Sequence, residues 1–166
     1  KNDLWDGIHE VISRTNPDQV VLETTGIAEP SAILDGMARV PAASRGRVVP
    51  AGVVCVVDAE VAADTVARRD EARDQLAVAD RVLLSKLDRA TPAQVRAAHA
   101  AIDAYAPSAE RASFPSRDDG DMALTSWMLE PRAVRVPSPR PHDHDHAHAH
   151  RGHHHRGSQL VAVAFA

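Results

Sequence analysis

Three short apolar runs, rich in valine and leucine, constrain the fold of this chain more than any other feature. They occupy residues 20–22, 53–57 and 82–84, and a stretch with helical spacing separates each run from the next. Continuous apolar runs between turn-forming residues are typical of strands buried on both faces. Strands that alternate with helices favour right-handed crossovers between parallel neighbours. The sequence therefore predicts an α/β fold, with helices on both faces of a parallel sheet.

The remaining elements follow from capping residues, periodicity and helix breakers. An amphipathic helix is expected from Asn2 to about Arg14, and Thr91 with Gln94 forms a capping box that opens a helix to about Tyr105. A short helix is predicted to begin at Ser31, followed by a surface loop over residues 42–52 and a helix, either continuous or broken, over 61–79. A weaker strand is predicted over 109–114, a second short helix over 124–129 and a final strand over 159–165.

Composition and charge exclude several classes of protein. Aromatic residues make up only 3% of the chain, which argues against an aromatic-rich β-sandwich. A formal net charge of −4 gives no electrostatic reason to expect a nucleic-acid partner. No apolar stretch is long enough to span a membrane, so we expect no membrane partner and a cytoplasmic location. The single cysteine, Cys55, rules out an internal disulfide and is expected to be buried and inert.

Polar residues follow each apolar run, and these candidates carry the chemistry. Glu23 ends the first run, with Gly26 three positions later, Asp58 ends the second, and Ser85-Lys86-Leu87-Asp88 ends the third. Parallel strands bring such residues to one sheet edge, where open α/β sheets bind ligands. A carboxylate there can hold a metal ion or a water, and a glycine lets a backbone N–H approach an anion. The alternative is a solvated glutamate followed by a turn glycine.

The sequences of these segments resemble those of the CobW-type family of metal-chaperone GTPases, which are P-loop GTPases. The resemblance rests on VVLETTGIAEP, VVCVVDAE and ADRVLLSKLD, followed by a histidine-rich insertion and a new strand. It covers almost the whole chain. ETTGIAEP is fairly specific, whereas SKLD alone would be weak. The resemblance implies a partial P-loop NTPase-like, three-layer fold, with GTP and Mg²⁺ as cofactors and GTP hydrolysis as the activity.

Site roles can be carried over from this resemblance. Glu23 would hold the magnesium-bound water as the Walker B carboxylate, and the N–H of Gly26 would face the γ-phosphate. Glu23 and Glu29 are also candidates for metal contacts near the switch segment. For Glu29, which precedes a proline, an exposed turn residue is the competing interpretation.

The resemblance assigns guanine recognition to the third strand end. Asp88 would accept hydrogen bonds from the guanine ring N–H and amino group, a contact that adenine cannot supply. Lys86 would lay its aliphatic stem along the base. Ser85 replaces the usual Asn or Thr, and we expect at most a weakened base specificity from this change.

Two motifs of the family are absent from these 166 residues: the GxxxxGK(S/T) phosphate loop and the CxCC metal motif. In the family both precede the helix that here begins near Asn2, so we expect the chain to be a fragment of a longer protein. Backbone N–H groups and a lysine around the phosphates supply most nucleotide affinity and hydrolysis. We therefore predict that this chain by itself is not a competent GTPase.

A histidine tract is the strongest feature that needs no family resemblance. Eight of the ten histidines lie within residues 142–155: His142, His144, His146, His148, His150, His153, His154 and His155. Imidazoles at this density can satisfy zinc, nickel, cobalt or copper in many interchangeable ways. Metal affinity should fall as histidines become protonated, because only neutral imidazole binds metal. A flexible spacer and an expression tag are the alternatives, and the internal position argues against a tag.

Together these inferences predict three regions and one function. Residues 1–136 form a partial GTP-binding domain, 137–157 a histidine-rich disordered linker, and 158–166 the start of a C-terminal domain. The function is a GTP-dependent metallochaperone that delivers a transition metal to a client metalloprotein; zinc (Zn²⁺) is favoured, and Co²⁺ and Ni²⁺ are the alternatives. A non-catalytic, histidine-rich metal-storage protein is the alternative. A nickel-insertion GTPase of the HypB or UreG type is disfavoured, because those proteins usually carry their histidines ahead of the phosphate loop.

Overall fold

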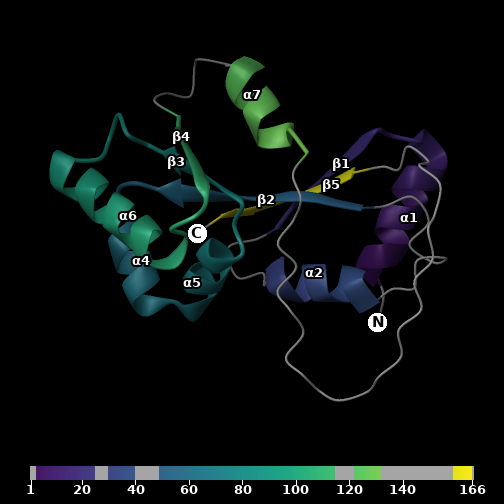
Figure 1. Ribbon diagram of the computed structural model, residues 1–166, viewed down its shortest axis with the longest axis horizontal. Coiled ribbons are helices and arrows are strands. Elements are labelled where there is room, and N and C mark those ends of the chain that lie inside the picture. The colour runs from purple at the N-terminus through teal and green to yellow at the C-terminus, as the bar shows by residue number, and fades with distance from the viewer. Residues whose placement is uncertain (1–2, 25–29, 40–48, 115–121, 132–158, 166) are drawn as a thin grey trace.

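The computed structural model describes residues 3–24, 30–39, 49–114, 122–131 and 159–165 (Figure 1). Within these ranges five parallel strands form one sheet in the order β1-β5-β2-β3-β4. The strands are β1 (Gln19–Glu23), β2 (Val49–Asp58), β3 (Arg81–Ser85), β4 (Glu110–Ser113) and β5 (Gln159–Phe165). The helices are α1 (Asp3–Thr15), α2 (Pro30–Arg39), α4 (Ala62–Arg68), α5 (Asp70–Ala77), α6 (Pro92–Tyr105) and α7 (Met122–Leu129).

The sheet is the middle layer of three. Helices α1, α2, α4, α5 and α6 lie along one face, and α7 covers part of the other (Figure 1). Parallel strands need such crossovers, because the chain must run back from the carboxyl end of one strand to the amino end of the next. The predicted α/β architecture with helices on both faces is therefore confirmed.

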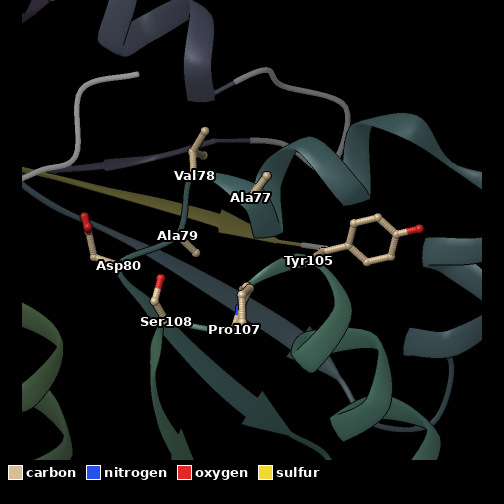
Figure 2. Close-up of a pocket in the computed structure, with 8 residues that line it drawn as sticks. Ala77, Val78, Ala79, Asp80, Tyr105, Pro107 and Ser108 are labelled. Carbon is tan, nitrogen blue, oxygen red and sulfur yellow. The ribbon is translucent and has the colours of Figure 1, made fainter. Parts of the chain in front are cut away.

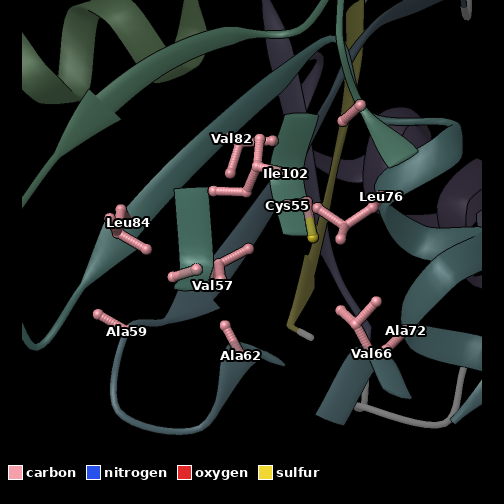
Figure 3. Close-up of a cluster of buried hydrophobic side chains, with 12 residues drawn as sticks. Cys55, Val57, Ala59, Ala62, Val66, Ala72, Leu76, Val82, Leu84 and Ile102 are labelled. Atoms are coloured by element: carbon pink, nitrogen blue, oxygen red, sulfur yellow. The ribbon is translucent and has the colours of Figure 1, made fainter. Parts of the chain in front are cut away.

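The main core lies between β2, β3 and helices α4, α5 and α6 (Figure 3). Cys55, Leu76 and Val82 are completely buried there, and Ile102 nearly so. Cys55 is a free thiol among apolar side chains, as the sequence predicted. Two neighbouring strands, β2 and β3, thus supply the sheet side of the main core.

A buried arginine attaches α7 to the opposite face. The Arg81 side chain is fully buried, and its Nη1 donates to the backbone oxygen of Met128 at 3.2 Å. Its guanidinium carbon lies 5.5 Å from the ring centroid of Trp127, and Glu110 and Glu130 supply carboxylates at 3.9 and 3.6 Å. A charge buried in this way must be paired to be tolerated. Arg81 therefore anchors α7 to the start of β3.

The predicted helix over residues 61–79 is broken in the structure. Arg69 adopts an extended conformation, with φ −125° and ψ 119°, and it separates α4 from α5. Arg73 closes the corner by donating through Nε to the backbone oxygen of Val66 at 2.7 Å. The capping box of α6 is confirmed, since Thr91 and Gln94 bond reciprocally. The first helix and the three predicted strands are confirmed as well.

Two local predictions are wrong. Strand β1 is not buried on both sides: Val21 is 50% exposed, because the apolar side chains of α7, the described helix on that face, pack against β2, β3 and β4 and not against β1. The predicted loop over 42–52 already becomes strand at Val49. The sheet accommodates the helix and strand breakers Pro50 and Gly52 through a register shift between them, and Gly52 takes a φ of 155° that favours glycine.

The final strand differs most from its expected position. Instead of starting a separate domain at residue 158, β5 lies between β1 and β2 and pairs with both. Its continuous apolar sequence, LVAVAF, suits a central parallel strand, because both edges of such a strand find backbone partners. In the described residues this segment is therefore part of the same sheet.

Candidate functional site

The carboxyl ends of β2 and β3 form the centre of the candidate site. Asp58 and Ser85 are the last residues of these strands and stand opposite each other in the register. The backbone N–H of Ala59 donates to the oxygen of Ser85 at 3.1 Å, and the Ser85 hydroxyl donates to the oxygen of Val57 at 3.0 Å. The backbone oxygen of Ser85 thus links the ends of β2 and β3, and its hydroxyl is used in a hydrogen bond to the backbone of β2.

Lys86 turns the chain sharply at this edge. It has a positive φ of 59°, which is uncommon for a residue with a side chain and is often found at functional sites. Its backbone oxygen accepts from the N–H groups of Arg89 and Ala90, both at 3.1 Å. Its ammonium donates to Oδ2 of Asp58 at 2.5 Å. The lysine side chain is therefore directed back across the end of β2.

Asp88 lies in the same turn with its carboxylate unengaged. The residue is exposed, and it makes no hydrogen bond or ion pair with any described residue. A carboxylate is an acceptor only, so an unengaged one can take two parallel hydrogen bonds from a flat donor pair. This is the property that the sequence analysis required of a guanine-reading residue.

The connection from β2 to α4 supports this turn from the other side. Glu60 is held by its backbone, since its N–H donates to Oδ1 of Asp58 and its oxygen accepts from Nε2 of Gln94, both at 2.9 Å. Its carboxylate lies 3.3 Å from Nε of Arg89. The two loops are thus joined by two ion pairs, Asp58 with Lys86 and Glu60 with Arg89.

Glu23 lies apart from this group. It ends β1 and is exposed, and its carboxylate makes no hydrogen bond or ion pair with a described residue. Through β5, Glu23 is level with Val54, four residues before Asp58. That offset corresponds to ~13 Å along the strand, and β5 adds two strand spacings of ~5 Å each. The expectation that all three strand ends form one close group therefore holds for β2 and β3 only.

Several predicted site residues lie outside the described residues. These are Gly26, Glu29 and the histidine tract from His142 to His155. Within the described ranges, no group of three or more His, Cys, Asp or Glu side chains could hold a metal ion. The metal-binding assignments remain predictions from the sequence.

A cavity of about 230 Å³ lies at the other edge of the sheet (Figure 2). Residues 77–80 and 105–108 line it, at the connections that lead into β3 and β4. Its carboxylate, Asp80, already accepts from the backbone N–H of Val53 at 2.9 Å. This cavity is at the amino ends of the strands, so it is separate from the Asp88 turn.

A sequence comparison decides the family. The family described as CobW/HypB/UreG, nucleotide-binding domain, matches residues 1–112. The chain belongs to this family. The matched range runs from α1 into β4 and contains Glu23, Asp58 and the Asp88 turn, but not α7, the histidine tract or β5. The α/β sheet is accordingly a partial P-loop NTPase-like fold, and the predicted resemblance is confirmed at the level of this nucleotide-binding, metallochaperone-type family.

Other comparisons add no further assignment for this CobW/HypB/UreG member. Neither the curated proteins nor the solved structures gave a significant match. The family description covers CobW, HypB and UreG together, so it does not separate the predicted CobW type from the other two. No helix in the described ranges has the length and apolar character needed to cross a membrane.

Sequence reasoning missed the two acids that support the turn. Asp58 was identified as a strand end but not as the partner of Lys86, and Glu60 and Arg89 were not identified at all. The sequence does hold a pattern from which the pairing could have been predicted. Two acids, at positions 58 and 60, follow the second apolar run, and two cations with nearly the same spacing, at positions 86 and 89, follow the third. Only the register of β2 with β3 shows that these two loops face each other.

Proposed function

We propose that this chain contains the segment that recognises guanine, here called the guanine-reading part, of a GTP-dependent metallochaperone of the CobW type. The observation that carries the proposal is the turn after β3, where the Asp88 carboxylate is exposed and unengaged while Lys86 is fixed beside it. The guanine ring N–H and amino group form a flat donor pair that a carboxylate can accept. Adenine offers an unprotonated ring nitrogen there, so the site disfavours it.

In this proposal Lys86 supplies the aliphatic stem against which the base lies. Its ammonium is held by Asp58, so the stem is fixed before the nucleotide arrives. The Ser85 hydroxyl donates to the backbone of β2, and in this proposal it does not need to contact the base. Restricting a side chain in advance reduces the entropy lost on binding.

The phosphate side of the site involves Glu23 and, by the resemblance, Gly26 and Glu29. The exposed Glu23 carboxylate is an oxygen ligand of the kind that magnesium prefers, and it would hold a magnesium-bound water. Magnesium would supply charge neutralisation at the phosphates. Ordering of the segment after Glu23 by nucleotide would then alter metal affinity or client contact, which is the switch we propose.

The metal is the cargo of this protein, and the histidine tract is its proposed binding segment. Eight imidazoles within residues 142–155 favour a borderline cation, with zinc preferred here and cobalt or nickel compatible with the same ligands. Delivery to a client metalloprotein in the cytoplasm completes the proposal. Equal metal affinity of the GDP-bound and GTP-bound full-length protein would contradict the switch.

The base-reading step can be tested on the 166-residue chain itself. Amide NMR spectra would be followed during titration with GMP and with AMP, which lack the β- and γ-phosphates that a P-loop would bind. We expect GMP to shift resonances of residues 85–90 with about millimolar affinity, equivalent to about 4 kcal/mol, and AMP to have no such effect. D88N should strongly weaken the GMP response, whereas D74N, a change at an exposed aspartate on α5, should retain it. Identical responses to GMP and AMP would contradict the proposal.

A second candidate function is non-catalytic metal storage, which the density of the histidine tract favours. Deletion of residues 142–155 separates the two. A storage protein would lose its function, whereas a guanine-reading protein would lose metal binding and keep its response to GMP. The proposal also expects no GTP hydrolysis at family-like rates by this chain alone, since it contains no GxxxxGK(S/T) segment.

A further inference from the structure

Two cations flank Asp88 within its own turn. Lys86 precedes it by two residues and Arg89 follows it directly, and the Lys86 oxygen that accepts from Arg89 N–H closes the turn around it. Lysine and arginine side chains so near in the chain can reach a neighbouring carboxylate, and opposite charges attract strongly at short range. Yet Asp88 forms an ion pair with neither of them.

Each of these cations is instead held by an acid from the β2–α4 connection. Lys86 Nζ lies 2.5 Å from Oδ2 of Asp58, and Arg89 Nε lies 3.3 Å from Oε2 of Glu60. The acids are the better-buried partners in both pairs: Asp58 is 20% exposed against 41% for Lys86, and Glu60 24% against 62% for Arg89. Acids that are more buried are less screened by solvent, so they compete well for the two cations.

The Asp58 carboxylate and the Glu60 backbone are also held by contacts that do not involve the cations. The Asp58 carboxylate also accepts from the backbone N–H of Glu60, and the Glu60 backbone oxygen accepts from Gln94 on α6. Gln94 is itself fixed by the capping box with Thr91. The Asp58 carboxylate and the Glu60 backbone are therefore set by the fold, which places both acids beside the longer cationic side chains.

We propose that Asp58 and Glu60 are positioning residues that keep Lys86 and Arg89 away from Asp88. The inference rests on the proposed guanine-reading role of Asp88 and deepens it. A carboxylate already paired with a cation must release that partner before it can accept from a base, and the apparent affinity falls by the fraction of chains in the paired state. Guanine affinity thus depends on two acids that do not touch the nucleotide.

An experiment without nucleotide tests whether Arg89 moves to Asp88 when the Glu60 carboxylate is removed. Solvent exchange of the Arg89 Nε proton would be measured by NMR in the wild type, E60A and E60A/D88N; the alanine change keeps both backbone hydrogen bonds of residue 60. We expect protection in the wild type and in E60A, where Arg89 moves to Asp88, and loss of protection in E60A/D88N. Loss of protection in E60A itself would overturn the inference, because Arg89 would then not turn to Asp88.

A binding experiment tests the consequence. GMP affinity should fall about tenfold in E60A and return to the wild-type value in E60A/R89Q, since the second change removes the competing cation. D103N, which breaks the distant pair of Asp103 with Arg111, is the matched control and should leave GMP affinity unchanged. An affinity loss that R89Q does not restore, or no loss in E60A, would overturn the inference. Absence of GMP binding by the wild type would instead refute the proposed function, and the proton-exchange result would still decide the inference.

Discussion

The ammonium of Lys86 lies 2.5 Å from the carboxylate of Asp58 and joins the ends of two neighbouring strands. The two residues are 28 positions apart in the chain, so the pair exists only because β2 and β3 are in register. Lys86 takes a left-handed backbone conformation at this point, and the turn that follows exposes Asp88. In this member of the CobW/HypB/UreG family, the sheet thus sets the geometry of the proposed base-reading turn.

Asp58→Asn tests the contribution of this pair to folding. The asparagine keeps the acceptor for the Glu60 N–H but loses the charge that binds Lys86. We expect a loss of about 1 kcal/mol in the free energy of unfolding, measured by urea denaturation, because the pair is partly shielded from solvent. Asp64→Asn, in an almost fully exposed 4.0 Å pair with Arg68, should change it by less than about 0.5 kcal/mol. Equal losses in both variants would contradict this.

Arg81→Met tests the attachment of α7. The change removes the hydrogen bond to Met128 and the contact with the Trp127 ring, while the apolar stem is retained. We expect a loss of about 2 kcal/mol and a red-shifted Trp127 emission, measured in a Trp5→Phe background, because α7 is then less firmly held. Unchanged emission would mean that the apolar contacts of α7 suffice without the arginine.

Gly52→Ala tests the backbone at the register shift in β2. A Cβ there would make only an ordinary contact of 3.7 Å with Arg81, so the cost comes from the φ of 155°. We expect a loss of at least about 1 kcal/mol. Gly7→Ala is the matched control, since nothing lies within 4 Å of its new Cβ in α1, and it should stabilise the protein by about 1 kcal/mol. The same sign of effect in both variants would be inconsistent with this account.

Truncation before Gln159 tests the position of β5. Because β5 pairs with β1 and β2 on its two sides, its loss leaves both neighbours without a partner along one edge. We expect the shortened chain to lose cooperative thermal unfolding, followed by circular dichroism. An unchanged transition would mean that Gln159–Phe165 is not a strand of this sheet, in agreement with the separate domain that the sequence analysis expected.

Local sequence signals predicted much of this fold. The apolar runs gave β2 and β3, and the Thr91–Gln94 capping box gave the start of α6, because these features act over a few residues. The break at Arg69 and the start of β2 at Val49 were less accessible, since the packing of distant segments decides both. The place of β5 depends on pairing with strands more than a hundred residues earlier in the chain.

Part of the candidate site could be proposed from the sequence, but its arrangement could not. The residues Ser85, Lys86 and Asp88 were proposed from the sequence of one segment. The contacts that Asp58 and Glu60 make with this segment depend on strand register and on the hydrogen bond from Gln94. Glu23 was expected beside them, but β5 and a four-residue offset separate it from Asp58. Sequence patterns report which residues end strands, and they do not report how far apart those ends lie.

The most direct test of the central claim exchanges the base preference of the Asp88 turn. Xanthine carries an oxygen where guanine carries the amino group, and an asparagine amide can donate to that oxygen while an aspartate carboxylate cannot. Titration of the wild type and D88N with GMP and XMP, followed by NMR, should show the wild type preferring GMP and D88N preferring XMP, each by about tenfold. The same preference in both proteins would contradict guanine recognition by Asp88.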